Sequence, residues 1–333
     1  MITGNFFHVK ASNGLFFYGL DYLEHNSDLV RTVLTRPKLA QRIREALPSV
    51  EVIECSGSRY LFEVMRANVR GDLLYTPTSH PLPAFNGQWI VLHDPYPFTV
   101  GPNAKLKRFL LKWSLAMSRC YVAYINHSEA QPFVAGLGVA AHRMVFAPNR
   151  FPEPAQLVTC DCHWNGITTV GLLGTDSAKK NYDWLFIAVR RAEFSSRLMF
   201  RVFGHDTAYF RDIRNKFAEI QIELARSDEE SIDEFLSSVD VFASASEQEG
   251  FGRPFASALL AGLPVELLDR PVFREFFNGG ARFHSDLDAL VQSLPRVPGT
   301  SRSQTSYTAP VEVVQAYARA NEEIRRLGSI VLR

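Results

Sequence analysis

The feature of this sequence that most limits its fold is an alternation of short apolar runs and helical patterns, which occurs twice along the chain. In the first half, runs rich in β-branched and aromatic residues predict strands at residues 5–9, 50–54, 73–76, 88–92, 121–125 and 144–147. Segments with helical periodicity lie between them, at residues 14–24, 38–46, 59–68, 104–118 and 129–136. Such alternation is typical of βαβ units on a parallel sheet.

The alternation stops near residues 148–164, where Pro152, Pro154 and the stretch Cys160-Asp-Cys162-His163 indicate a linker. It restarts with strands predicted at residues 167–173, 198–203, 219–223, 239–243 and 263–267. Helices are predicted at residues 182–192, 207–217, 229–237, 256–261, 286–294 and, after a loop at 295–306, at 310–327. We therefore predict two doubly wound α/β domains, residues 1–150 completed by a last helix within 308–333, and residues 151–307.

Composition and motifs exclude several classes of protein. The 36 Lys and Arg residues nearly balance the 35 Asp and Glu, so we expect no nucleic-acid partner. No apolar run reaches the ~20 residues of a membrane helix, and the N-terminal residues lack the pattern of a secretory signal. The sequence contains no G-x-G-x-x-G, Walker lysine, G-x-S-x-G or H-E-x-x-H motif. These features predict a cytoplasmic protein and disfavour nicotinamide enzymes, P-loop ATPases, α/β-hydrolases and zinc proteases.

Two stretches contain residues in a pattern that can bind a metal ion, and both have a simpler structural interpretation. Cys160-x-Cys162-His163 places three ligands within four residues, which are hard to arrange around one tetrahedral ion. Asp286-x-Asp288 directly precedes a helical pattern, where an acidic side chain caps free N–H groups. We therefore expect no metal ion and no cofactor.

The predicted helix at residues 104–118 is basic and amphipathic. Four cations, Lys105, Lys107, Arg108 and Lys112, alternate there with large apolar residues. The favoured interpretation is a helix that covers a sheet and turns its charges to water. The alternative is contact with an anionic membrane surface, where each Lys or Arg contributes ~1 kcal/mol.

The block from Ser246 to Pro254 carries the strongest chemical signal. It predicts a strand, a glycine-rich loop and a helix that begins near Pro254. Gly250 and Gly252 let the backbone approach a ligand, and free N–H groups at the helix start suit a phosphate. Glu249 beside such an anion site is suited to hold hydroxyl groups or a developing cation. A purely structural turn is the alternative that the glycines alone leave open.

This block resembles the signature S-x-x-E-G-F-G-x-P of the large retaining family of GT-B glycosyltransferases. That family includes sucrose synthases, phosphatidylinositol mannosyltransferases and bacterial lipopolysaccharide and capsule enzymes. Further similar segments occur in the family's order, from about residue 73 to residue 283: His93-Asp94, Asn126-His127-Ser128-Glu129, Ala147-Pro148-Asn149, Val170-Gly171, Lys179-Lys180-Asn181 and Glu275.

The resemblance implies a GT-B fold, with two Rossmann-like domains that face a cleft and a last helix that returns to the first domain. It implies that Glu249 and His93 lie beside the donor sugar and that Lys180 neutralises the diphosphate leaving group. The other residues that it implies for the donor's phosphates and sugar are Phe251, Gly252, Arg253, Gly14 and Ser257. The nucleobase would rest near Gly204 and residues 224–228, which include Arg226.

Two positions depart from the family's pattern. Ser257 stands where a second glutamate usually holds the ribose, and Gly174 stands where an arginine usually binds phosphate. Arg253 is able to replace the missing positive charge, because a guanidinium grips phosphate in a fork geometry.

The expected function is retaining, metal-independent transfer of a hexosyl group from a GDP- or UDP-sugar, with GDP-mannose as first choice. The acceptor would be a glycan or lipid-linked molecule in bacterial polysaccharide or cell-envelope synthesis. The enzyme would be cytoplasmic or peripheral on the inner face of the membrane. Two alternatives stay open, which are a catalytically impaired glycan- or nucleotide-binding protein and a sugar-nucleotide epimerase on the same fold.

Overall fold

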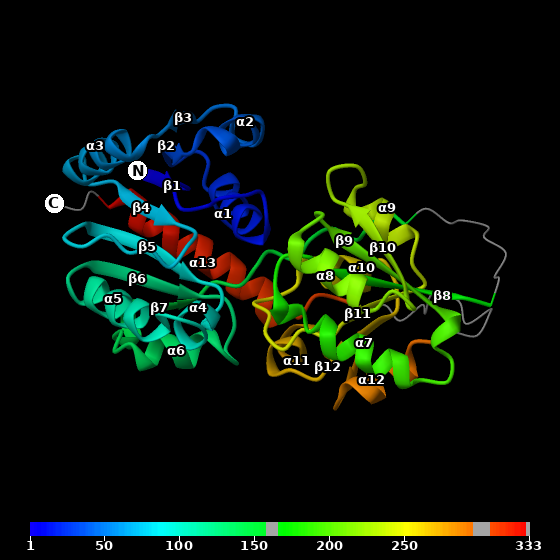
Figure 1. The fold of residues 1–333 in the computed structure, drawn as a ribbon. Helices are drawn as coiled ribbons and strands as arrows, with labels where there is room; N and C mark the ends of the chain where they lie inside the picture. The colour runs from blue at the N-terminus through cyan, green and yellow to red at the C-terminus, as the bar shows by residue number, and fades with distance from the viewer. Residues whose placement is uncertain (158–165, 296–306, 331–333) are drawn as a thin grey trace. The chain divides into compact units, whose positions relative to one another are not determined.

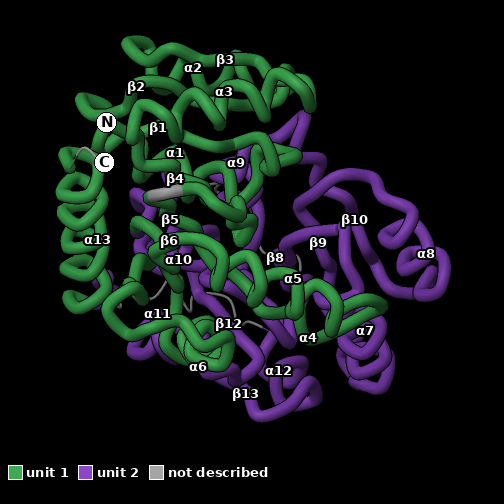
Figure 2. The backbone as a smooth tube through the Cα atoms, turned by 90° about the vertical axis from the view of Figure 1, so that its left-hand side faces the viewer, with its two compact units in different colours: residues 1–150, 311–333 green, residues 151–310 purple. Residues whose placement is uncertain are grey.

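A computed structural model describes residues 1–157, 166–295 and 307–330. The cysteine-containing stretch at 160–163 and nearly all of the loop predicted at 295–306 lie outside these residues. The chain divides into two compact units, Met1–Arg150 with Val311–Arg333, and Phe151–Pro310 (Figure 2). Below they are called unit 1 and unit 2.

Unit 1 contains a seven-stranded parallel sheet with the strand order β3-β2-β1-β4-β5-β6-β7 (Figure 1). Its strands are β1 (Ile2–Asn5), β2 (Val30–Thr35), β3 (Glu51–Glu54), β4 (Leu73–Thr76), β5 (Asn86–Leu92), β6 (Arg119–Tyr124) and β7 (Met144–Phe146). Its helices are α1 (Gly14–His25), α2 (Pro37–Ala46), α3 (Gly57–Val69), α4 (Tyr96–Thr99), α5 (Ala104–Ala116), α6 (Ala130–Gly136) and α13 (Val311–Ser329). The order reverses between β1 and β4, as expected for a doubly wound sheet.

Helices cover both faces of this sheet because its central strands are apolar on both sides. Tyr75 and Trp89 point to the face covered by α1, α2 and α13. Leu74 and Ile90 point to the opposite face, where α3 packs against β2–β4, and α5 and α6 pack against β5 and β6. Figure 2 shows α13 and α5 on opposite sides of the strands.

The last helix, α13, completes the core of unit 1, which confirms the predicted return of the chain. Ile324 and Leu327 are buried in the same apolar cluster as Ile2. The buried amide of Asn26 donates to the Asn321 side chain at 2.8 Å. The contacts with α1 and β1 therefore span almost the whole length of the sequence.

Unit 2 contains a six-stranded parallel sheet with the order β10-β9-β8-β11-β12-β13. Its strands are β8 (Thr168–Leu173), β9 (Leu198–Gly204), β10 (Gln221–Arg226), β11 (Val241–Ser244), β12 (Val265–Leu268) and β13 (Arg282–His284). Its helices are α7 (Tyr182–Arg191), α8 (Ala208–Lys216), α9 (Ile232–Ser237), α10 (Arg253–Leu260), α11 (Pro271–Phe277) and α12 (Leu287–Ser293). The predicted fold class, two doubly wound α/β domains, is confirmed.

The structure corrects the first predicted strand and adds elements that the patterns did not predict. The first strand ends at Asn5, and Phe6 and Val9 are buried from a loop rather than from a strand. An apolar run does not distinguish these two cases. The prediction also omitted β2, α4, α11 and β13, of which β13 has only three residues.

Candidate active site

The carboxyl ends of β8 and β11 form the switch point of unit 2, because the strand order reverses between these adjacent strands. Ligands of open α/β sheets bind outside the carboxyl ends of the strands at such points. Two loops reach this position. The loop after β8 leads through Lys180 into α7, and the loop after β11 carries Glu249 and leads into α10.

Local backbone geometry positions Lys180. A 3₁₀ turn, Ala178–Lys180, begins where the Ser177 side chain accepts a hydrogen bond from the Lys179 N–H. Asn181 then takes left-handed dihedral angles, with φ 62°, and leads into α7. As a result, Lys180 is buried although it carries an ammonium group.

Lys180 and Glu249 form a buried ion pair. The Lys180 Nζ atom donates to Glu249 Oε1 at 2.6 Å, and the two side chains are only 10% and 13% exposed. Burial by itself raises the pKa of Glu249. The nearby charges of Lys180 and Lys179 and a hydrogen bond from Ser246 lower it by more, so the pKa lies below its usual value. The carboxylate is therefore ionised at neutral pH.

The signature loop after Glu249 is shaped by packing. Gly252 has φ +91°, and a Cβ atom there would lie 2.6 Å from the Phe255 ring. The Phe251 ring is buried against Phe276, with centroids 4.8 Å apart, so Phe251 can offer only its backbone to a ligand. Arg253 is the first residue of α10. The helix start thus presents backbone N–H groups beside an arginine.

The two departures from the family pattern have structural counterparts. Gly174 has φ +89°, and a Cβ atom there would meet Lys180 Cε at 2.6 Å, so the lysine stem occupies the space that a side chain would need. Ser257 is buried in α10, and its hydroxyl donates to the Glu153 carbonyl oxygen at 2.9 Å. Ser257 therefore ties α10 to the segment that enters unit 2.

The residues predicted near the nucleobase lie at the ends of β9 and β10. A Cβ atom at Gly204 would lie 2.5 Å from Thr175 Oγ1, which also accepts from the His205 N–H at 3.0 Å. Arg226 forms ion pairs with Asp228 and Glu229, both at 3.0 Å. The structure thus brings Gly204 close to the β8 loop, while Arg226 is paired with carboxylates.

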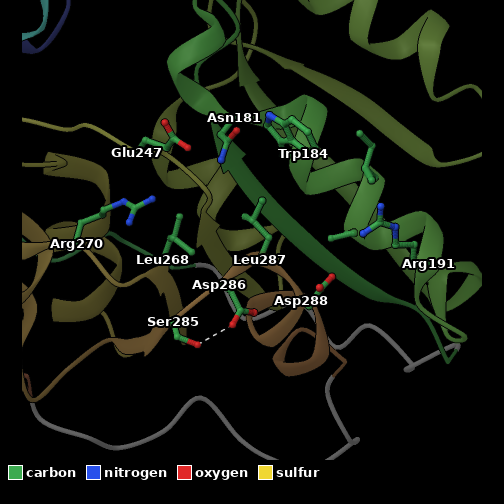
Figure 3. Close-up of a pocket in the computed structure, with 12 residues that line it drawn as sticks. Asn181, Trp184, Arg191, Glu247, Leu268, Arg270, Ser285, Asp286, Leu287 and Asp288 are labelled. Atoms are coloured by element: carbon green, nitrogen blue, oxygen red, sulfur yellow. Dashed lines mark hydrogen bonds between the residues drawn. The ribbon is translucent and has the colours of Figure 1, made fainter. Parts of the chain in front are cut away.

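A cavity of about 350 Å³ lies at the same edge of unit 2, between α7 and α12 (Figure 3). Its lining includes Asn181, Trp184, Glu247 and Arg270. The buried Nε atom of Arg270 has no hydrogen-bond partner among the residues that the structure describes. Sequence analysis missed Trp184 and Arg270. The position of Arg270 just after the predicted strand could have indicated it, because ligands of open α/β sheets bind at the carboxyl ends of the strands.

Asp286 lines the same cavity and serves as the cap that the sequence predicted. Its side chain accepts a hydrogen bond from the Ala289 N–H at 2.8 Å at the start of α12. Among the described residues, no three His, Cys, Asp or Glu side chains form a group that could hold a metal ion.

In unit 1, His93 follows β5 and is partly buried. Its Nε2 lies 3.0 Å from the Pro77 carbonyl oxygen, so this nitrogen carries the proton that is donated. The ring packs edge-on against Tyr18, with centroids 4.5 Å apart. Burial lowers the pKa of His93 to about 4, despite the opposing effect of the Pro77 bond. His93 is therefore a neutral imidazole at physiological pH.

The switch point of unit 1 lies between β1 and β4, and two histidines stack there. His8 follows β1 and His80 follows β4, with ring centroids 4.5 Å apart and planes 6° from parallel. Burial and the nearby charges of His80, Arg36 and Lys10 lower the pKa of His8 to about 4. Sequence analysis missed this pair.

Gly14 was predicted to lie near the donor phosphates. It begins α1 after the cap residue Asn13, whose side chain accepts from the Leu15 N–H. Gly14 is exposed, and a Cβ atom there would have no neighbour within 4 Å. The described backbone therefore requires no glycine for space at this position.

Comparisons with known proteins identify a related family for unit 2 and similar folds for the whole chain. Residues 165–296 match the family model described as Glycosyl transferases group 1. The whole chain resembles the structure of Anabaena HepE in complex with UDP and glucose, with a TM-score of 0.72, 15% identity and 99% coverage of both chains. It also resembles WaaG, a glycosyltransferase involved in lipopolysaccharide biosynthesis, with a TM-score of 0.59, 14% identity and coverage of 98% of this chain and 95% of that one.

A third similar structure is a glycosyltransferase from Rickettsia africae, with a TM-score of 0.63, 13% identity and coverage of 98% and 93%. No curated protein matches the sequence. No helix among the described residues is long and apolar enough to cross a membrane. At these identities the structural matches show the fold alone. The chain therefore has the GT-B fold, and the part of unit 2 that carries Lys180 and Glu249 matches the group 1 glycosyl transferase family.

Proposed function

We propose that this protein is a retaining glycosyltransferase that uses a nucleoside diphosphate sugar. The observation that carries the proposal is the buried Lys180–Glu249 pair at the switch point of unit 2, inside the segment that matches the family. An ammonium group and a start of a helix can hold a diphosphate, and a carboxylate can face a sugar. The structurally similar glycosyltransferases support the same class of reaction.

In the proposed reaction, the bond between the anomeric carbon and the diphosphate oxygen breaks. A bond from an acceptor hydroxyl oxygen to the same carbon forms on the same face of the sugar, and the hydroxyl proton ends on the diphosphate. Lys180, Arg253 and the α10 N–H groups would stabilise the negative charge that develops on the leaving group. Glu249 would stabilise the positive charge that develops on the sugar, and neutral His93 would lie beside the sugar from unit 1.

We propose that this chemistry needs no metal ion. Activity should survive a chelator, and proton NMR should show that the product keeps the anomeric configuration of the donor. A product of inverted configuration, or activity that manganese alone restores, would place the enzyme in a different mechanistic class.

The donor remains to be identified by experiment. The sequence favoured GDP-mannose, whereas HepE of Anabaena was solved with UDP and glucose. Thermal-shift measurements with UDP, GDP, ADP, TDP and their common sugars should identify the base, because a ligand of the folded state raises stability by RT ln(1 + [L]/Kd).

Two alternative functions make different predictions. An epimerase would convert the donor into an isomer without any acceptor. A catalytically impaired binding protein, suggested by Ser257 and Gly174, would bind a nucleotide sugar but release no nucleoside diphosphate. Product analysis with and without an acceptor distinguishes all three.

We further propose a glycan or lipid-linked acceptor held by unit 1, with the enzyme at an anionic membrane surface on the cytoplasmic side. The stacked His8 and His80 rings at the switch point offer a flat surface for a sugar. The four α5 cations Lys105, Lys107, Arg108 and Lys112 are all exposed. Neutralising them should abolish co-sedimentation with anionic vesicles and leave transfer to a soluble acceptor intact.

A further inference from the structure

Unit 1 exposes an unusual set of large apolar side chains. Most of those that the described residues expose belong to α3, to α5 or to the residue that follows α5: Leu61, Phe62, Met65, Val69, Leu106, Phe109, Leu110, Trp113 and Met117. Single exposed apolar residues are normal on soluble proteins, but a clustered set indicates an interaction surface.

On α5 these side chains form a continuous stripe. Leu106, Leu110 and Trp113 follow one another at intervals of four and three residues, and they are 54%, 48% and 49% exposed. The opposite side of the helix buries Leu111 and Leu115 against β5 and β6. The helix is therefore apolar both toward the sheet and toward the outside.

Helix α3 repeats this arrangement. Leu61, Met65 and Val69 follow one another at intervals of four residues and are 61%, 68% and 88% exposed. Tyr60 and Val64 on another side of the helix are buried against the sheet. The core alone therefore does not account for the apolar residues of α3.

The two stripes belong to the same side of the molecule. Helix α3 packs on the sheet face that contains Leu74, and α5 packs on the face that contains Ile90. These are one face, since Ile90 pairs with Thr76, which lies two residues after Leu74 on β4. We call the exposed sides of α3 and α5 the α3–α5 face.

The positive charges on the α3–α5 face favour an anionic lipid surface over a second copy of the chain as its partner. Helix α5 contains no acidic residue, and Lys105 and Lys107 lie on either side of its stripe. On α3, Arg59 and Arg66 lie beside the apolar residues and are exposed, and Arg66 also pairs with Glu63 at 3.6 Å. Two copies of the chain that met through this face would bring cations together, whereas an anionic lipid surface attracts them.

We propose that the α3–α5 face docks on an anionic membrane, with the apolar stripes at the boundary between headgroups and acyl chains. The cations around the stripes contact the lipid phosphates. This inference rests on the proposed membrane location and deepens it, because it makes apolar side chains and a second helix part of the contact. Arg108 contributes less than the other α5 cations, because its guanidinium lies over the Phe133 ring at 5.4 Å.

The test measures binding of the purified full chain to phosphatidylcholine vesicles with and without 30% phosphatidylglycerol, in the absence of any nucleotide. Leu61→Ser with Met65→Ser, and separately Leu110→Ser with Trp113→Ser, should each lower the partition coefficient at least ~10-fold, since each removes two large apolar groups from the contact. The matched control is Val311→Ser with Val314→Ser on α13, where both residues are also exposed. The control should bind like the wild type.

Several outcomes would overturn the inference. Binding that depends on the cations but not on the α3 or α5 apolar residues would mean that the stripes do not enter the lipid. A wild-type dimer that Met65→Ser dissociates would assign the face to a second copy of the chain. Circular dichroism of each variant excludes unfolding as the cause, and donor hydrolysis without vesicles tests the transferase proposal separately.

Discussion

The carboxyl ends of the two sheets share a topology but differ in chemistry. Unit 2 places a buried ammonium against a buried carboxylate at its switch point, and the pKa of Glu249 lies below its usual value. Unit 1 places histidines after the carboxyl ends of β1 and β5, and the pKa values of His8 and His93 are lowered to about 4. One edge is therefore suited to phosphate and developing charge, and the other to the neutral surface of a sugar.

This difference shows that the two edges are specialised by a few side chains rather than by the fold. Burial acts on both edges and disfavours charge in both. In unit 2 the opposite charges of Lys180 and Glu249 overcome it, whereas the hydrogen bond of His93 goes to the neutral Pro77 carbonyl oxygen. The following predictions test whether the charged pair and the neutral imidazole are both required.

The largest effect is expected at Glu249. Glu249→Gln keeps the shape and a hydrogen-bond acceptor for Lys180 but removes the negative charge. Turnover should fall ~100- to 1000-fold, the cost of losing one group that stabilises developing charge. Steady-state kinetics measure this loss, and Glu193→Gln, an exposed carboxylate of unit 2 outside the cavity lining, is the control. Turnover of Glu249→Gln within tenfold of the wild type would remove Glu249 from the mechanism.

The second prediction concerns pH and His93. Its folded-state pKa is about 4 and its usual value is 6.5, so the unfolded chain binds the proton first as the pH falls. Stability of unit 1 should therefore decrease between pH 6.5 and pH 4, by about 3 kcal/mol from this group.

Denaturant unfolding of the wild type and of His93→Gln, each at pH 7 and pH 4.5, measures this contribution. The variant should lose less stability on acidification, because glutamine can still donate to Pro77 and does not titrate. The exposed His142 provides the control variant, His142→Gln. An equal loss in all three proteins would show that His93 is not neutral in the folded state.

A smaller effect is expected at Arg253, the cation at the start of α10. Arg253→Ala should weaken binding of the nucleoside diphosphate by ~10-fold, which corresponds to about 1.4 kcal/mol. Isothermal calorimetry provides the measurement, and Lys216→Ala on α8 controls for a general loss of positive charge. If both variants bind equally well, then Lys180 and the helix start neutralise the diphosphate without Arg253.

The smallest effect is expected at Ser257. The Ser257 hydroxyl donates its hydrogen bond to the Glu153 carbonyl oxygen, and we expect that the ligand does not need it. Ser257→Ala should therefore change nucleotide affinity by less than ~10-fold. It should instead lower the free energy of unfolding of unit 2 by about 1 kcal/mol, the usual contribution of one hydrogen bond. A large loss of affinity with unchanged stability would show that the hydroxyl does contact the ribose.

Sequence patterns predicted the architecture well because parallel α/β sheets produce strong alternation. The predicted strand at residues 73–76 coincides with β4, and the predicted helix at 14–24 differs from α1 by one residue. The sequence patterns failed where contacts with elements distant in the sequence determine the local structure. β2 follows a turn and contains the exposed Arg31, and its other five residues are buried because β1 and β3 flank it and helices cover both faces of the sheet.

The candidate site was predictable as a set of residues but not as a geometry. The resemblance indicated Lys180 and Glu249, yet their contact joins residues 69 positions apart and depends on the adjacency of β8 and β11. The reason for a glycine at position 174 was also not predictable from a local pattern, because the aliphatic part of the Lys180 side chain occupies the space that a side chain there would need. The stacking of His8 on His80 requires the adjacency of β1 and β4, which no local pattern reveals.

The position of α13 has a consequence for how the protein is made. Unit 2 interrupts unit 1 in the sequence, so the ribosome synthesises all of unit 2 before it adds the helix that buries Ile2 and Leu23. Unit 2 has every strand of its own sheet by then and can fold as translation proceeds. Unit 1 must wait with part of one sheet face uncovered, the part that α1 and α2 do not cover, until Ile324 and Leu327 emerge. That interval is when the nascent chain most needs protection from aggregation.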